Sequence, residues 1–167
     1  NAGMIKAEGC TLSAYEIVVA EANTLILNAK TALDRSLEDA QSLDSTIFTA
    51  DSYAALKKVM DESSLLVQST TSTLEQLTQE FAKLDNAKKA LINVSGLKAI
   101  VDQSSTYVKD SYTHRSYTAY ETSLNAAKQV LKNSASTVED IEKAQSALNT
   151  AAASLVKKAD FSKLNEK

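Results

Sequence analysis

The stretch Phe48-Thr49-Ala50-Asp51-Ser52-Tyr53 returns, in the same pattern, as Tyr112-Thr113-His114-Arg115-Ser116-Tyr117, 64 residues further along the chain. The same offset relates other positions without a gap, namely Leu33 to Leu97, Thr73 to Thr137, Glu75 to Glu139, Leu84 to Leu148 and Leu91 to Leu155. Self-similarity at a fixed spacing indicates a repeat architecture. The sequence therefore predicts two copies of one structural unit.

Each copy contains three runs in which apolar residues recur every three or four positions, which is typical of helices with one buried face. In the first copy the runs are Leu33, Leu37, Ala40, Leu43 and Ile47; Tyr53, Leu56, Met60 and Val67; and Leu74, Leu77, Phe81, Leu84 and Leu91. Ser63, Ser64 and Lys88 interrupt these runs. In the second copy they are Leu97, Val101, Ser104 and Val108; Tyr117, Tyr120, Leu124, Ala127 and Leu131; and Val138, Ile141, Ala144, Leu148, Ala151 and Leu155.

The composition also favours helices, since the 167 residues include no proline and 3 glycines. We therefore predict an all-α fold: two tandem three-helix bundles in an elongated array, with an extra N-terminal helix. An odd number of antiparallel helices brings the chain in at one end of a unit and out at the other. Tandem units would then extend as a rod instead of folding back.

Threonines stand where the helical runs begin, and a threonine hydroxyl can accept from an unpaired first-turn N–H. We expect N-caps at Thr31, Thr49, Thr73, Thr113 and Thr137. Thr73 and Gln76 have the spacing of a capping box. With Thr49 as N-cap, Phe48 and Tyr53 occupy the two positions that meet as a hydrophobic staple. Helix-start geometry alone thus accounts for the recurring motif.

The domain organisation follows from these boundaries. We expect an N-terminal helix within residues 1–30, read as the remnant of a preceding repeat, then repeats at 31–93 and 94–158 and a tail at 159–167. The N-terminal helix is indicated by Leu12, Tyr15, Val19, Ala22, Ile26 and Ala29. The junction Asn93-Val94-Ser95-Gly96 allows two alternatives, a short turn with Ser95 as cap or a slightly kinked continuous helix.

Several classes of function are disfavoured. The net charge of −3 and the absence of a basic block argue against nucleic acid as a partner. No apolar run is long enough for membrane insertion. Cys10, the single cysteine, has no internal disulfide partner; we interpret it as a buried or idle thiol, with a lipid anchor as the weaker alternative.

No catalytic or cofactor site is predicted either. His114 is the single histidine, whereas a metal site needs several converging ligands. Acidic neighbours such as Glu139 and Asp140 point in different directions on a helix, so they read as solvated surface and not as an acid–base pair. We expect a protein that is not an enzyme and binds no cofactor.

The best candidate for ligand binding is aromatic. Tyr107, Tyr112, His114, Arg115 and Tyr120 gather, together with Tyr117, around one predicted helix junction of the second copy. Exposed tyrosines can stack on sugars or anchor a protein partner. The alternative interpretation is that these rings belong to the hydrophobic staple and to the core of the bundle.

The aromatic-Thr-x-x-Ser-Tyr motif resembles that of FIVAR ("found in various architectures") modules. The run Ala126-Ala127-Lys128-Gln129-Val130-Leu131 and the stretch Ser136-Thr137-Val138-Glu139 extend the similarity over about residues 95–157, and the copy at about 31–92 is more divergent. Tyr53 and Tyr117 stand where the family usually has tryptophan. The resemblance implies three-helix bundles in a surface or secreted protein of a Gram-positive bacterium.

Two functional hypotheses follow. The first is a rigid spacer or stalk that projects neighbouring domains of the same polypeptide from a cell-surface or secreted protein. The second is an adhesion or carbohydrate-binding module that recognises a glycan or a host-matrix protein through the tyrosine-rich junction. Both place the chain outside the cell.

Overall fold

The computed structural model describes residues 12–159, and within this range the predicted all-α fold is confirmed, with six α-helices. These residues fall into two compact units, one made of 12–43 and 54–90 and the other of 44–53 and 91–159. Cys10 and the tail beyond Ala159 lie outside the described residues.

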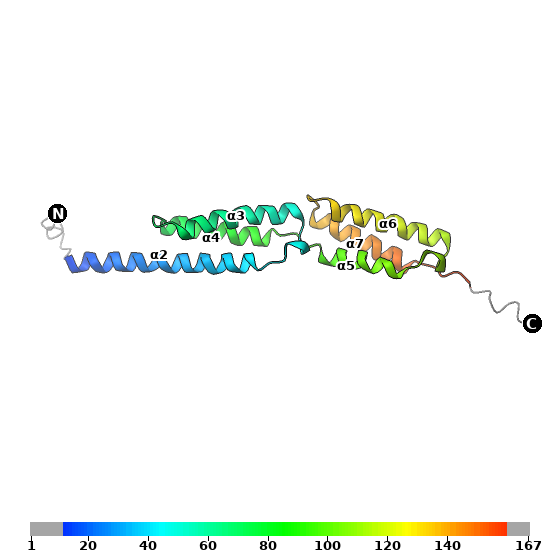
Figure 1. The fold of residues 1–167 in the computed structure, drawn as a ribbon, viewed down its shortest axis with the longest axis horizontal. Coiled ribbons are helices and arrows are strands. Elements are labelled where there is room, and N and C mark those ends of the chain that lie inside the picture. Colours follow the sequence, from blue (N-terminus) through cyan, green and yellow to red (C-terminus); the bar gives the residue numbers. More distant parts are fainter. Residues whose placement is uncertain (1–11, 160–167) are drawn as a thin grey trace, which may run out of the picture. The chain divides into compact units, whose positions relative to one another are not determined.

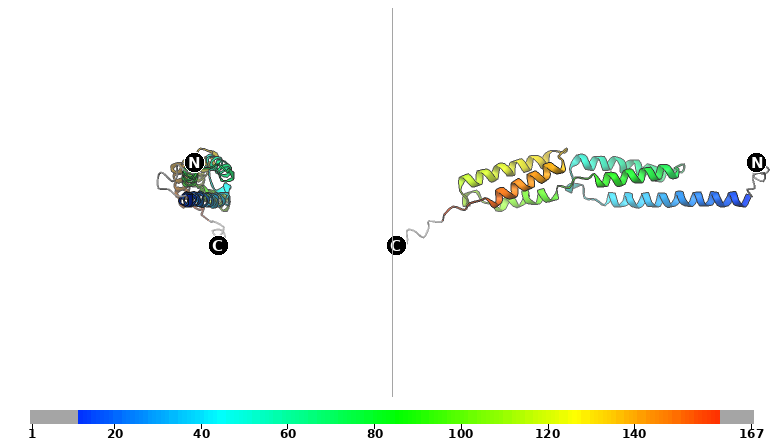
Figure 2. Two further views of the ribbon diagram at one scale, coloured as in Figure 1. Left: turned by 90° about the vertical axis from the view of Figure 1, so that its left-hand side faces the viewer. Right: turned by 180° about the vertical axis from the view of Figure 1, so that it is seen from behind.

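The first unit contains α2 (Leu12–Gln41), most of α3 (Ala50–Gln68) and α4 (Leu74–Lys89). Figure 1 shows α3 and α4 as a hairpin beside the C-terminal half of α2, while the N-terminal half of α2 runs on beyond the α3–α4 loop. The view from behind in Figure 2 shows the same overhang. The side chain of Lys30 donates to the carbonyl of Ser69 in that loop, which marks where the hairpin ends along α2.

The prediction of a separate N-terminal helix followed by a new helix capped by Thr31 is wrong. Residues 12–41 form one continuous helix of 30 residues. Thr31 lies in its interior, and its hydroxyl donates to the carbonyl of Leu27 at 2.9 Å instead of accepting from a first-turn N–H. The extra helix is therefore the N-terminal extension of the first helix of the repeat.

Leucines form the core of the first unit, and polar groups replace apolar ones at two places where the pattern was interrupted. The buried leucines are Leu33, Leu37, Leu56, Leu77 and Leu84. Ser63 is fully buried on α3, and its hydroxyl donates to Oε1 of Glu80, itself 6% exposed, on α4 at 3.2 Å. Lys88 on α4 donates to the buried Ser36 hydroxyl on α2 at 2.9 Å. Because these polar groups are hydrogen-bonded to each other, their burial does not carry the free-energy cost of an unsatisfied donor or acceptor.

The second unit contains α5 (Ser95–Asp102), α6 (His114–Lys132) and α7 (Val138–Ala153). Two short 3-10 segments, Gln103–Thr106 and Lys109–Ser111, connect α5 to α6. The buried cluster consists of Val94, Leu97, Tyr120, Leu124, Ala127, Ile141, Ala144 and Leu148. The chain enters the bundle of α5, α6 and α7 at the start of α5 and leaves it beyond α7, at the opposite end of that bundle (Figure 1).

The first helix of the second repeat is shorter than its apolar pattern suggested. We expected helix through Val108, but α5 ends at Asp102. Beyond it the hydroxyls of Ser105 and Thr106 donate to the carbonyls of Asp102 and Gln103. Serine and threonine hydroxyls that bond locally in this way compete with helical hydrogen bonding.

The junction between α4 and α5 is a turn and not a continuous helix. Residues 91–94 are non-helical, and Oδ1 of Asn93 accepts from both the backbone N–H of Ser95 at 2.8 Å and its hydroxyl at 2.6 Å. The expected role of Ser95 as cap is therefore wrong, because Asn93 supplies the accepting oxygen.

The 64-residue offset holds in three dimensions. The bounds of α3 and α4 become those of α6 and α7 when 64 is added to each residue number. The 3-10 segment Ser45–Ile47 likewise corresponds to Lys109–Ser111. The helix starts and stops are therefore properties of the repeated sequence.

Candidate functional site

The recurring aromatic-Thr-x-x-Ser-aromatic motif binds the chain segment that leaves its own repeat. In the first copy the backbone N–H of Thr49 donates to the carbonyl of Ile92 at 2.9 Å, and the N–H of Val94 donates to the carbonyl of Ile47 at 2.8 Å. Phe48 and Asn93 form an isolated antiparallel bridge between these bonds. The exit segment thus lies antiparallel to the residues that precede α3.

The serine of the motif adds a side-chain contact to this pairing. The Ser52 hydroxyl accepts from the backbone N–H of Ile92 at 3.2 Å and donates to the carbonyl of Thr49 at 3.0 Å. The Thr49 hydroxyl donates to Ser52 Oγ at 2.8 Å. We call the arrangement formed by Thr49, Ser52 and Ile92 the exit clamp.

The second copy builds the same clamp from Thr113, Ser116 and Val156. The N–H of Thr113 donates to the carbonyl of Val156 at 2.8 Å, and the N–H of Val156 donates to the Ser116 hydroxyl at 3.1 Å. Tyr112 and Lys157 form the equivalent bridge. Identical contacts at both copies show that the motif has a tertiary role that the staple interpretation missed.

The staple itself is confirmed. The rings of Phe48 and Tyr53 are stacked with centroids 6.5 Å apart, and those of Tyr112 and Tyr117 are stacked at 6.4 Å. These aromatic pairs cover the start of each helix beside the clamp. The serine at the third position after the threonine was the signal that could have revealed the clamp, because a staple does not require it.

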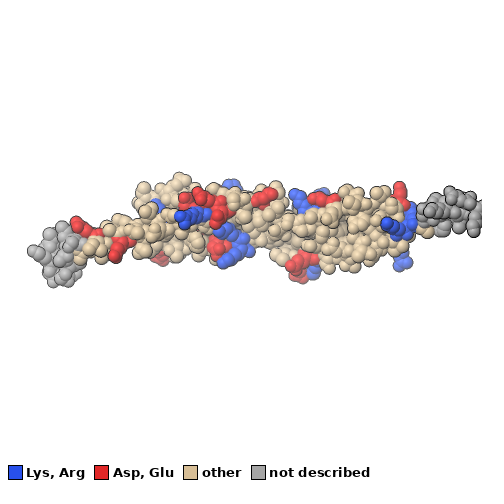
Figure 3. Space-filling model, turned by 90° about the horizontal axis from the view of Figure 1, so that it is seen from below, with Lys and Arg blue, Asp and Glu red and all other residues tan. Residues whose placement is uncertain are grey.

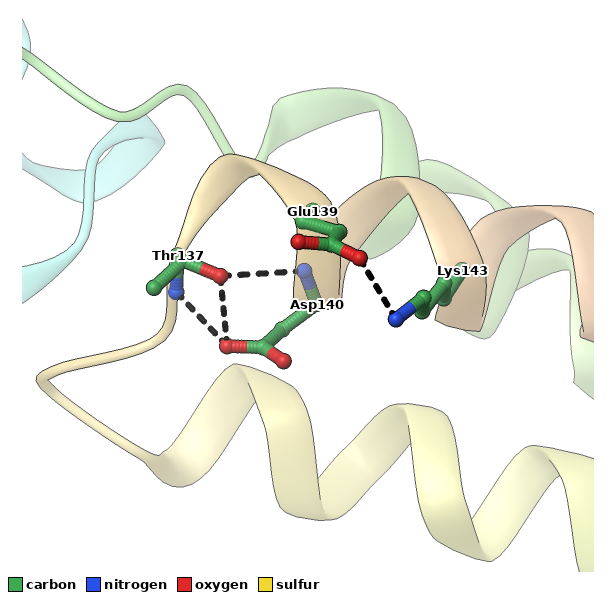
Figure 4. A network of polar contacts seen from close by, with 4 residues as sticks. All are labelled: Thr137, Glu139, Asp140 and Lys143. Atoms are coloured by element: carbon green, nitrogen blue, oxygen red, sulfur yellow. Dashed lines mark hydrogen bonds and ion pairs between the residues drawn. The ribbon is translucent and has the colours of Figure 1, made fainter.

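The predicted capping threonines divide into two groups. Thr73 and Thr137 form complete capping boxes with Gln76 and Asp140, as Figure 4 shows for the second. Thr137 Oγ1 accepts from the backbone N–H of Asp140 at 3.2 Å, and Asp140 Oδ2 accepts from the N–H of Thr137 at 2.9 Å. This backbone bond, followed by the Thr137 hydroxyl, lowers the pKa of Asp140 below its ordinary value of 3.8.

Thr49 and Thr113 behave differently. Thr113 occupies the N-cap position of α6, but its side chain accepts no hydrogen bond from the first turn. Its hydroxyl instead lies 2.9 Å from Ser116 Oγ, as Thr49 bonds to Ser52. The prediction that these hydroxyls cap the helices is wrong, because the clamp uses them.

The tyrosines of the second repeat do form one cluster. The ring of Tyr107 lies 5.1 Å from that of Tyr120 and 6.2 Å from that of Tyr112, measured between centroids, and Tyr117 lies 5.8 Å from Tyr120. The Tyr117 hydroxyl donates to the carbonyl of Tyr107 at 3.3 Å, and Lys109 Nζ lies 5.8 Å from the Tyr117 ring centroid.

The candidate ligand-binding residues differ in accessibility. Tyr120 is 1% exposed and belongs to the core, and burial, reinforced by the neighbouring phenols, raises its pKa above the ordinary 10.0. Tyr107 and Tyr112 are half-buried, whereas His114 and Arg115 are exposed in the first turn of α6. Tyr107 and Tyr112 are therefore partly accessible to a ligand, whereas Tyr120 is not. Binding by these residues stays a prediction.

The described residues show no grouping of three or more His, Cys, Asp or Glu side chains that could hold a metal ion. Between residues 12 and 159, no helix has the length and apolar character needed to cross a membrane. In Figure 3 the acidic and basic side chains visible on each unit are interspersed, and neither sign gathers into a broad patch on that face.

Comparison with known proteins agrees with this geometry. The sequence model of the FIVAR domain matches residues 29–91 and 93–156, so the first match ends one residue before the clamp residue Ile92 and the second ends at the clamp residue Val156. No curated protein and no solved structure matches the chain. FIVAR domains are accessory, non-catalytic modules that occur in various architectures, often in extracellular proteins. The matches cover most of the chain, and it therefore belongs to the FIVAR family as a tandem of two domains.

Proposed function

We propose that this chain is a spacer segment of an extracellular protein, without catalytic activity of its own. The observation that carries the proposal is the exit clamp, formed twice with the same hydrogen bonds at a 64-residue offset. A spacer must fix the direction in which the chain leaves each repeat. The clamp supports this role because it holds the exit segment by backbone and side-chain bonds where a flexible linker would have none.

A further backbone contact lies beside the first clamp. The N–H of Asp51, two residues after Thr49, donates to the carbonyl of Ser134 in the α6–α7 loop at 3.3 Å. Residues 44–53 belong to the same compact unit as residues 91–159, so this bond and the first clamp both lie within that unit. The odd number of helices in each repeat also supports extension, since the chain leaves a repeat at the end opposite to its start.

Small-angle X-ray scattering of the full chain tests the spacer. A compact protein of this length has a radius of gyration of roughly 15 Å. Helices of 30 and 19 residues placed end to end, at 1.5 Å per residue, span about 75 Å and give a radius of gyration above about 20 Å. A value near 15 Å would contradict the spacer.

A second candidate is carbohydrate binding at the tyrosine cluster, favoured by the partial exposure of Tyr107 and Tyr112 beside Lys109. A glycan array with the wild-type chain and the variant Tyr112→Ala tests it. Phe48→Ala is the matched control, because Phe48 occupies the same staple position in the first repeat. Binding lost in Tyr112→Ala and kept in Phe48→Ala would support a glycan-binding site; no binding to any glycan would contradict it.

A further inference from the structure

The N-terminal half of α2 carries an apolar stripe on its exposed surface. Tyr15 and Val19 on this stripe are 54% and 39% exposed, and Val18 and Leu25 at its edge are 61% and 54% exposed. Ile17 and Leu27, at 58% and 63%, lie on other sides of the same helix. A monomeric soluble protein seldom leaves so many apolar side chains in solvent along one helix, and contiguous patches of this kind mark interaction sites.

The stripe continues an interface that already exists. Its residues recur at intervals of three and four positions, and they are Tyr15, Val19, Ala22, Ile26 and Ala29. The same spacing continues into the core residues Leu33, Leu37 and Ala40. Residues at this spacing share one face of a helix. The face of α2 that packs on α4 in the first unit is therefore the same face that becomes exposed where the hairpin ends.

We propose that this stripe is a self-association surface, on which the α2 extension of a second copy of the chain packs antiparallel. The proposal goes beyond the spacer role, because it assigns α2 a partner. Pairing about a twofold axis between Ala20 and Glu21 places Val19 opposite Ala22 of the second copy and Tyr15 opposite Ile26 of the second copy. Such a contact is isologous, so each pair occurs twice.

Side-chain size favours the antiparallel register. It sets the small Ala22 against the larger Val19, so that successive layers differ less in volume than they would in a parallel pair. A parallel pair in register would set Ala22 against Ala22 and Tyr15 against Tyr15, which alternates gaps with crowding. Even filling of a core is what close packing requires.

The charges are compatible with this register. Glu16 and Glu21 are the charged residues between positions 14 and 29. Glu16 flanks the stripe and lies level with Leu25 of the second copy, while Glu21 lies roughly 100° or more around the helix from the stripe. No two carboxylates are brought face to face, so the pairing carries no like-charge penalty.

The free length of α2 also fits a second copy. In this register the start of α2 from the second copy, residue 12, lies level with Ala29. A groove of about 200 Å³, lined by Ala29, Ala32, Leu77, Thr78 and Phe81, begins at that level between α2 and α4. The α2 helix of the second copy thus ends at the level where the α3–α4 hairpin begins to cover the stripe.

Sedimentation equilibrium of the full chain tests the proposal, under reducing conditions so that Cys10 cannot link two copies. We expect an apparent mass that rises with concentration toward twice the chain mass of 17.9 kDa. Val19→Lys places a charge in the centre of the pairing and should leave the monomer mass. Thr24→Lys is the matched control, since Thr24 is exposed on the opposite face of the same helix turns and should leave association unchanged.

Spin labels test the orientation. With Asn28→Cys labelled in a Cys10→Ser background, antiparallel pairing separates the two labels by roughly 22 Å along the helix axis. Parallel pairing would bring the two helix positions within about 10 Å of each other. A monomer at all concentrations, a dimer that survives Val19→Lys, the parallel distance, or a stripe that binds an added helical peptide but never a second copy would each overturn the proposal.

Discussion

Replacement of Ser52 by alanine should weaken the exit clamp of the first repeat and leave the helices intact. The substitution removes the acceptor of the Ile92 N–H, at 3.2 Å, and the acceptor of the Thr49 hydroxyl, at 2.8 Å. Both groups are partly buried, so water replaces the lost oxygen incompletely. A part-buried donor left without its partner costs about 1–3 kcal/mol.

An opposing contribution reduces the net effect. Ser52 lies in the first turn of α3, where alanine is the better helix former by about 0.5 kcal/mol. We therefore expect the exit segment to open more easily by about 1–2 kcal/mol, which corresponds to a 5- to 30-fold rise in the population of the open state.

Amide hydrogen exchange at Ile92 measures this opening directly. The exchange rate should rise by that factor in Ser52→Ala, whereas the Val156 amide in the second clamp should be unaffected. Ser64→Ala is the control, because Ser64 lies on the same helix and has a local contact with Gln68. Equal exchange rates for the Ile92 amide in Ser52→Ala and Ser64→Ala would refute the clamp.

Three further predictions concern the second repeat. Gly96→Ala should stabilise it by about 0.5–1 kcal/mol in thermal unfolding, because a Cβ at this helical position would meet the flexible Gln145 side chain at 3.4 Å without a clash; a lower midpoint would contradict this. Thr137→Ala should lower the free energy of unfolding by about 1 kcal/mol in urea and raise the pKa of Asp140 in an NMR titration. Because the pKa of Asp140 is lowered in the folded state, the ionised carboxylate stabilises the fold above pH 3.8, and this stabilisation is lost as the pH falls. The raised pKa of Tyr120 affects stability in the opposite direction, because the protonated phenol stabilises the fold fully below pH 10.0 and this stabilisation is lost as the pH rises. The free energy of unfolding, followed by circular dichroism above pH 10, should therefore depend less on pH in Tyr120→Phe.

The helices that could be predicted closely are those with local start signals. The capping boxes at Thr73 and Thr137 lie directly before α4 and α7, and the staples lie directly before α3 and α6. The residues in these motifs are within six positions of one another, so the sequence alone holds all the partners. The family could be recognised for the same reason, because its motif is a helix start.

The polar groups in the first core could be noticed in the sequence but not explained by it. Ser63 and Lys88 interrupt apolar runs, and their partners Glu80 and Ser36 lie 17 and 52 residues away. The sequence likewise predicts the tyrosine cluster as a group, but Tyr120 is buried and the other tyrosines are not, and a spacing pattern does not report burial.

The sequence by itself determined the repeat, its 64-residue period and the all-α class, because these depend on apolar spacing and on contacts within one helix turn. The tertiary structure decided where the first helix of each repeat begins. Residues 90–94 leave the helical conformation where they pair with 47–49, whereas residues 26–30, at the equivalent position 64 residues earlier, stay helical within α2. The helix break near Ile92 depends on a hydrogen bond to Ser52, 40 residues away, so local helix propensity cannot predict it.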